Sequence, residues 1–283
     1  MTNSTATGPF VKMQGIGNDF VVLEPRHWPD TDWPSLSMGI CDRRAGVGAD
    51  GLLLVDQEEP GRYRMRMFNP DGTEDDCGNG LRCVVRYIRS ALAGEDRMTI
   101  RTLSGLHQAE VLAKGPGWSR IRVTMPPPLL RPEEIPMIAP GPVVIDYPID
   151  TGTGKRAFTC VFTGSTHAIT FLDRPVDEEV FRTESPRIER HRIFLERTSV
   201  LWAWPDGPDR YRVRIWERGV GATLGCGTGA CAVAVAARLR GAAGGPVTVT
   251  SAGGELEIDW DGDGEIRMTG PAVTVFEGEW PRR

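Results

Sequence analysis

The chain has 283 residues, about twice the usual size of one domain, so its length predicts one large domain or two of ordinary size. Hydrophobic residues make up 40% of it and charged residues 25%, which excludes the disordered and collagen-like classes. The 33 basic and 38 acidic side chains give a net charge of -5, so we expect no nucleic-acid partner.

The sequence contains no run of about 18 apolar residues and no export signal at its start, so we expect no membrane contact and a cytoplasmic location. Its six cysteines are too sparse for a disulfide scaffold, and a cytosol would keep them reduced. None of its three lysines lies in a context suited to a pyridoxal cofactor. We therefore expect no cofactor.

The first elements in chain order are a turn, two strands and a helix. Residues 46–51 match the dinucleotide-binding pattern of three glycines, but the apolar run 52–55 that follows is typical of a strand instead of the required helix. The alternating residues 62–68 predict a second strand. A polar loop then leads to Cys77-Gly78-Asn79-Gly80 and to a helix over residues 81–92.

The second half of the chain repeats this order. Residues 210–216 echo the strand at 62–68, 148 residues later, and Cys226-Gly227-Thr228-Gly229 echoes the first such motif, 149 residues later. A helix over residues 230–239 follows, and like the first it is apolar on nearly every face, as when a sheet curls about a central helix. Cys83 and Cys231, inside these helices, are expected to be small core residues.

A proline-rich connector at residues 126–136 suits neither a helix nor a central strand, so it marks the domain boundary. We predict two pseudo-symmetric α+β domains of like topology, at residues 1–128 and 129–270. The strand expected at about residues 271–283 packs on the first domain in this prediction.

Each Cys-Gly-X-Gly motif precedes a buried helix, where unpaired backbone amides and the positive end of the helix dipole gather. A thiol at such a place is expected to have a lowered pKa, and the glycines let amides approach an anion such as a carboxylate. If the domains face each other across a cleft, Cys77 and Cys226 flank one small molecule. One cysteine, as a thiolate, then removes a proton from a carbon atom, and the other, as a thiol, delivers a proton to its opposite face, which inverts the carbon. The backbone amides of Gly78, Asn79, Gly227 and Thr228 hold the carboxylate of the substrate.

Other roles for the cysteines fit less well. The spacing between Cys77 and Cys83 misses the usual zinc knuckle, so we expect no metal. A disulfide between Cys77 and Cys226 would inactivate this site by oxidation, and nothing in the sequence pairs a histidine with a cysteine nucleophile.

The chain resembles the diaminopimelate epimerases, the cofactor-independent two-cysteine enzymes of bacterial lysine and peptidoglycan synthesis. The matching segments extend over nearly the whole length and are residues 12–20, 46–51, 68–74, 77–80 and 217–221, the last before 226–229. The resemblance implies a barrel-like mixed sheet around a central helix in each domain, an active site in the interdomain cleft and a homodimer.

The resemblance also implies roles for individual residues. Cys77 and Cys226 are the acid and base, and Asn18 and His167 lie near the reacting centre. The α-carboxylate is bound by Asn79, Gly227 and Thr228, and the distal end of the substrate by Asn69, Glu217 and Arg218.

The chain departs from the family pattern mainly where the substrate's distal end is bound. Ser165 and Ser199 stand where the family usually has asparagines, and Ala222 where it commonly has a glutamate. Asp75 and Asp76, beside Cys77, would oppose thiolate formation if they pointed inward. The chemistry therefore looks intact while the specificity pocket looks altered.

We expect epimerisation of LL-diaminopimelate to the meso isomer. A racemase of histidine or of a basic amino acid such as ornithine or lysine is an alternative, and so is an inactive homologue that binds an amino acid. The two retained Cys-Gly-X-Gly motifs count against the inactive homologue.

Overall fold

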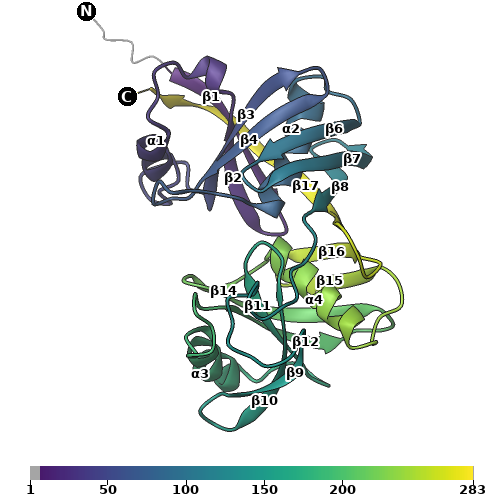
Figure 1. Cartoon of the computed structure of the whole chain (residues 1–283). Helices are drawn as coiled ribbons and strands as arrows, with labels where there is room; N and C mark the ends of the chain where they lie inside the picture. Colours follow the sequence, from purple (N-terminus) through teal and green to yellow (C-terminus); the bar gives the residue numbers. More distant parts are fainter. Residues whose placement is uncertain (1–6, 283) are drawn as a thin grey trace, which may run out of the picture. The chain divides into compact units, whose positions relative to one another are not determined.

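The computed structural model describes residues 7–282, an α+β fold that divides into two compact units (Figure 1). Unit 1 contains the described residues up to Val123 and from Gly270 onward, and unit 2 contains Thr124–Thr269. The chain therefore passes between the units twice, within strands β8 (Trp118–Met125) and β17 (Ile266–Pro281).

Unit 1 is a closed barrel of eight strands. Each strand pairs with the next in the order β1, β2, β3, β4, β6, β7, β8 and β17, and β17 pairs with β1 to close the ring. The pairs β2–β3 and β4–β6 are parallel. Besides β8 and β17, the strands are β1 (Thr7–Gly15), β2 (Asn18–Leu23), β3 (Gly51–Glu59), β4 (Arg62–Phe68), the short β5 (Glu74–Asp75), β6 (Arg97–Thr102) and β7 (Gly105–Gly115).

The helix α2 (Gly78–Ala91) lies inside this barrel and contacts β1, β2, β3, β4, β6 and β7. All its residues from Gly78 to Ile88 are buried, including two arginines. The short helix α1 (Trp33–Ile40) and the 3-10 turn η1 (Pro25–His27) complete the helical elements of the unit. Helix α1 packs on the outer face of the sheet through Ile40, so β3 is covered on both faces and begins with five buried residues.

Unit 2 repeats the arrangement. Its strands pair in the order β9, β10, β11, β12, β13, β15, β16 and β17, with parallel pairs β11–β12 and β13–β15 at the places equivalent to those of unit 1. The strands are β9 (Val144–Asp150), β10 (Lys155–Phe162), β11 (Thr166–Phe171), β12 (Ser199–Pro205), β13 (Arg210–Glu217), β14 (Gly221–Thr223), β15 (Val247–Ser251) and β16 (Gly254–Asp259). Helix α4 (Gly227–Leu239) contacts β10, β11, β12, β15 and β16.

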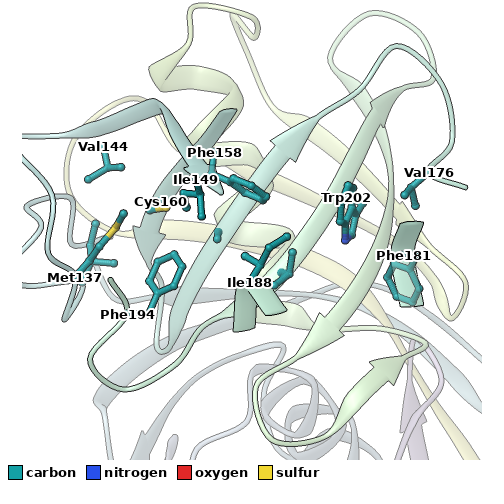
Figure 2. Packing of buried hydrophobic residues seen from close by; sticks show 13 residues of the cluster. Met137, Val144, Ile149, Phe158, Cys160, Val176, Phe181, Ile188, Phe194 and Trp202 are labelled. Atoms are coloured by element: carbon teal, nitrogen blue, oxygen red, sulfur yellow. The ribbon is translucent and has the colours of Figure 1, made fainter. Parts of the chain in front are cut away.

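Helix α3 (Glu178–Glu189) of unit 2 takes the place of α1 and covers the opposite face of β9–β12. Figure 2 shows the apolar cluster that joins them, with Phe181 and Ile188 from the helix and Phe158 and Trp202 from the sheet. The indole nitrogen of Trp202 donates to Ser185 Oγ at 2.9 Å, which satisfies the polar atom of this fully buried side chain.

The predicted strands at residues 52–55, 62–68 and 210–216 are confirmed, and residues 46–51 precede a strand as expected. The two central helices begin three residues earlier than predicted, at Gly78 and Gly227. Glycine disfavours a helix interior, which is why the sequence suggested a later start, but a first turn whose amides need no helical partner tolerates it.

Candidate active site

The two cysteines occupy the same position in the two units. Cys77 is the N-cap of α2, with φ −148° and ψ 113°, and Cys226 is the N-cap of α4, with φ −137° and ψ 115°. Each sulfur accepts a hydrogen bond at 3.4 Å from a backbone amide in the first turn, Gly80 N in one unit and Gly229 N in the other. The sulfur thus takes the place that a serine or aspartate oxygen usually has at an N-cap.

The last glycine of each motif is closely packed beside the cysteine. A Cβ atom on Gly229 would lie 3.2 Å from Leu201 Cδ2 and 3.3 Å from Cys226 Sγ. A Cβ on Gly80 would lie 3.0 Å from Leu53 Cδ2. A larger residue at either position would press on the barrel wall beside the sulfur.

Around Cys77 lies a group of amide and charged side chains, here called the Cys77 cluster: Asn18, Asp50, Cys77, Asn79 and Arg82. Cys77 Sγ lies 3.6 Å from Asn18 Oδ1, which also accepts from Asn79 Nδ2 at 3.3 Å. Asn79 Oδ1 in turn accepts from Arg82 Nη2 at 2.8 Å. Arg82 is fully buried, so its charge acts in a medium of low dielectric constant.

A network of ion pairs continues the Cys77 cluster on the other side of Asn18. Asn18 Nδ2 donates to Asp50 Oδ2 at 2.7 Å, and Asp50 Oδ1 pairs with Arg43 at 2.6 Å. Arg43 also binds Asp19, which pairs with Lys12 at 2.6 Å. Burial opposes the charge of Asp19, but the hydrogen bonds from Arg43 and Lys12 prevail and lower its pKa to about 2.

Around Cys226 lies a different group, here called the Cys226 cluster: Ser165, His167, Glu217, Cys226 and Thr228. Cys226 Sγ lies 3.4 Å from Thr228 Oγ1. His167 Nε2 lies 3.3 Å from the same hydroxyl and 3.1 Å from Ser165 Oγ. The Cys226 cluster is therefore built mainly from hydroxyls and an imidazole in place of amides.

The electrostatics of the Cys226 cluster disfavour charge. Burial, and next the carboxylate of Glu217, raise the pKa of the Cys226 thiol well above its usual value. The prediction of a lowered pKa is therefore wrong for Cys226, because desolvation and a nearby negative charge outweigh the Gly229 amide and the Thr228 hydroxyl. Burial, and next the charge of Arg218, lower the pKa of His167 to about 3, so its ring is neutral. His167 Nδ1 is buried and has no hydrogen-bond partner within the described part of the chain.

The predicted distal residues of unit 2 lie beside this cluster. Ser199 is the register partner of His167 across the parallel pair β11–β12, and its hydroxyl accepts from Arg218 N at 3.1 Å. Arg218 Nη1 donates to Glu196 O at 3.2 Å, and the Thr223 hydroxyl donates to the Glu217 carboxylate. The predicted residues of unit 2 therefore gather at one end of its sheet.

Asn69 is placed by other contacts in unit 1. Its side-chain Nδ2 donates to Thr73 Oγ1 at 3.1 Å, and its backbone carbonyl oxygen accepts from Ser37 Oγ at 2.8 Å. These contacts hold the loop between β4 and β5. Asp75 is exposed, and Asp76 Oδ1 accepts from the Leu103 amide at 3.2 Å, so each carboxylate has a place outside the Cys77 cluster.

The other helix cysteines are core residues, as expected. Cys83 and Cys231 are fully buried, and burial raises the pKa of Cys83 to about 12. Residues 7–282 contain no group of three or more histidine, cysteine or acidic side chains that could hold a metal ion. Within the same range, no helix has both the length and the apolar character needed to cross a membrane.

Sequence reasoning missed several residues of the two clusters. The sequence indicates only a turn at Asp50, and it does not single out Arg82, although an arginine in a helix expected to be buried is itself a signal. Thr163 and Thr223, which contact members of the Cys226 cluster, were also missed. The Thr163 hydroxyl donates to the Thr228 carbonyl at 2.9 Å, a contact that depends on distant segments meeting in space.

Comparison with known proteins identifies the family. A model of the family described as "Diaminopimelate epimerase" matches residues 10–129 and 159–275. The chain belongs to the diaminopimelate epimerase family. It is 42% identical to the diaminopimelate epimerase of Moorella thermoacetica, over 96% of this chain and 99% of that relative. It is 43% identical to that of Desulforudis audaxviator, with the same coverage. Membership in this family places the chain among the isomerases.

Solved structures of low sequence identity share the fold. A probable proline racemase from Agrobacterium radiobacter matches with a TM-score of 0.69 and 17% identity, over 96% of this chain and 92% of that one. A phenazine biosynthesis protein of the PhzF family from Bacillus anthracis matches with a TM-score of 0.65 and 16% identity, over 97% and 99%. These proteins and the present chain therefore share one overall fold.

Proposed function

We propose that the protein is an amino-acid epimerase that converts LL-diaminopimelate to the meso isomer without a cofactor. The observation that carries the proposal is the duplication of one motif geometry, a cysteine at the N-cap of a buried helix in each unit with a backbone amide on its sulfur. The names of the relatives at about 40% identity support diaminopimelate as the substrate.

In the proposed mechanism, both cysteines act on the same α-carbon. One thiolate removes the α-proton, and the thiol of the other cysteine delivers a proton to the opposite face, so that the configuration inverts. The amides of Gly78, Asn79 and Gly227 would bind the substrate carboxylate and stabilise the charge that develops on it as the proton leaves.

The surroundings of the two cysteines suit the proposed roles of one base and one acid. Cys226 is held as a thiol by burial and by Glu217, so it requires a change in its surroundings, such as the arrival of a positively charged ammonium group, to ionise. His167 is neutral and lies within hydrogen-bond distance of Thr228. We assign His167 a binding role beside the reacting centre and no role as a charged acid.

A second substrate class is favoured by the structure around Ser165 and Ser199. The Ser165 hydroxyl contacts His167 within the Cys226 cluster, and the Ser199 hydroxyl accepts from the Arg218 amide beside that cluster. Both side chains are shorter than the asparagines that the family usually has there. A racemase of histidine or of a basic amino acid such as ornithine or lysine is the alternative that this observation supports. We further propose a cytoplasmic homodimer as the working form.

The proposal is tested by incubating freshly reduced protein with LL-diaminopimelate and separating the stereoisomers by chiral chromatography. The expected result is formation of meso-diaminopimelate until the two isomers reach equilibrium. Both enantiomers of histidine, ornithine and lysine are tested in parallel. Inversion confined to one of these would replace the proposed substrate, and no inversion of any would overturn the assignment as an active epimerase.

A further inference from the structure

The amide of Asn18 is held from both sides by groups whose hydrogen-bonding direction is fixed. Asp50 is a carboxylate, which only accepts, and it binds one end of the Asn18 amide at 2.7 Å. That end must therefore be the NH2 group. The other end, the carbonyl oxygen Oδ1, faces Cys77 Sγ at 3.6 Å.

The direction is fixed independently from the side of Asn79. Arg82 is a guanidinium, which only donates, and it binds Asn79 Oδ1 at 2.8 Å. The NH2 group of Asn79 must then be the end that meets Asn18 at 3.3 Å, so the partner atom on Asn18 must accept. Both sides of the network therefore require Asn18 to present its oxygen to Cys77.

This orientation has a chemical consequence for Cys77. A carbonyl oxygen accepts from a thiol S–H but repels a thiolate, so it favours the protonated sulfur. Were the amide reversed, its NH2 group would donate to the sulfur and favour the thiolate. The direction of this amide thus sets whether it adds to the effect of the Gly80 amide, which donates to the sulfur and favours the thiolate, or opposes it, as the observed orientation does.

We propose that Asp50 is a positioning residue that locks the Asn18 amide with its oxygen on Cys77 and so keeps that cysteine ready to donate a proton. Asp50 does not touch the sulfur and acts through Asn18. Its second oxygen is tied to Arg43 at 2.6 Å, and its Oδ2 also accepts from the Asp19 amide at 3.1 Å, so the carboxylate cannot turn to follow Asn18. The activity arm of the test depends on the proposed function, but the alkylation arm does not.

The test compares three variants by the rate at which iodoacetamide alkylates Cys77 at pH 7, followed by mass spectrometry of its peptide. D50N can both donate and accept, so it removes the shorter, charged constraint on the Asn18 amide and leaves the longer 3.3 Å bond from Asn79 to oppose its reversal. D50E retains an acceptor-only carboxylate. D19N removes a negative charge from the same ion-pair network without removing a bond to the Asn18 side chain, and so serves as the matched control for charge.

We expect Cys77 of D50N to be alkylated about tenfold faster than in the unaltered protein. The reason is that a reversed Asn18 amide donates to the sulfur and so stabilises the reactive thiolate instead of the thiol. We expect D19N and D50E to stay within about twofold of the unaltered protein. A D50N rate equal to that of D19N would overturn the proposal, because the effect would then be one of charge alone. Unchanged alkylation in D50N would overturn it as well.

The second readout is turnover of the amino acid that the protein epimerises. D50N is expected to lower kcat about tenfold while KM stays within about threefold, because an acid is lost and substrate binding is not. A rise in KM at constant kcat would contradict the proposal. If the unaltered protein inverts none of the amino acids, the proposed function fails, while the alkylation rates still decide the role of Asp50.

Discussion

The two central helices share a backbone frame but differ in the chemistry they carry. Both begin at a cysteine N-cap with a glycine amide on the sulfur. Helix α2 continues with the buried arginines Arg82 and Arg86, whereas α4 continues with Cys231 and a run of alanine and valine. The repeated backbone places each sulfur at the start of its helix, and the side chains around each sulfur determine whether the thiol or the thiolate is favoured.

The surroundings of the two cysteines make the same point. Cys77 contacts an amide oriented by Asp50, whereas Cys226 is buried beside a hydroxyl and the carboxylate of Glu217. The proposed reaction needs one cysteine protonated and the other ionised, and different neighbours favour different protonation states of the two sulfurs. Mutations can separate the effect of the shared N-cap geometry from the effects of the different side chains around the two cysteines.

The largest effect is expected from removing either N-cap cysteine. C77A and C226A should each lower the rate of inversion by at least about a thousandfold, because each removes a group that transfers a proton. Stereoisomer formation measured by chiral chromatography checks this. The matched controls are C83A and C231A, which shorten core side chains and should retain most activity. Full activity in C77A or C226A would contradict the claim that both cysteines transfer a proton.

The next effect concerns stability and the neutral His167. Its pKa is about 3 in the folded protein and about 6.5 when unfolded, so between these values only the unfolded chain binds the proton. The stability it contributes is present above pH 6.5 and is lost as the pH falls. From pH 7 to pH 5, the unaltered protein should lose about 2 kcal/mol more of its free energy of unfolding than H167Q. Urea titrations at both pH values measure this, and equal losses would refute it.

A smaller effect is expected from Glu217. E217Q removes a negative charge beside Cys226, so the pKa of that thiol should fall and its thiolate should appear at a lower pH. The increase in thiolate absorbance near 240 nm with pH, measured in a C77A background, should move to lower pH. D75N is a suitable control, because Asp75 is an exposed carboxylate of unit 1. An unmoved titration in E217Q would show that burial alone controls Cys226.

The smallest effect is expected from Ser199. S199A removes the acceptor of the Arg218 amide and should lower the free energy of unfolding by about 1 kcal/mol. A rise in KM of a few-fold should accompany it if the loop at Arg218 binds the distal end of the substrate. S251A, in a hydroxyl-to-backbone bond on β15, is the matched control for stability. Unchanged KM in S199A would remove the loop from the binding site.

Much of the fold could be predicted from the sequence because the chain carries its pattern twice. Residues 62–68 and 210–216 alternate as strands, and the positions of Cys77 and Cys226 follow from the repeat. The electrostatics could not be predicted in the same way. A helix N-terminus favours a thiolate, but the burial of Cys226 and the approach of Glu217 depend on packing between segments that are distant in sequence, and they reverse the expected direction.

The same reason explains the residues that were missed. Asp50 lies in a glycine-rich turn, and the turn alone explains the local sequence pattern. The contact between Asp50 and Asn18, 32 residues away, forms only in the folded barrel. Arg82 and Asn79 are three residues apart in α2, but their bond becomes informative only once Asn18 is seen beside them. The sequence therefore located the two N-cap cysteines, while the structure was needed to find the side chains that contact them.

The most direct test of the central claim, that two cysteines share one α-carbon, is the early time course of the reaction in deuterated water. With reduced protein and LL-diaminopimelate, mass spectrometry of each separated isomer gives its deuterium content. The account predicts meso-diaminopimelate with one deuterium at the inverted carbon while the remaining LL isomer carries none, because the proton is removed by one group and replaced by another. Deuterium entering both isomers at equal rates from the start would show a single exchanging base and contradict the account.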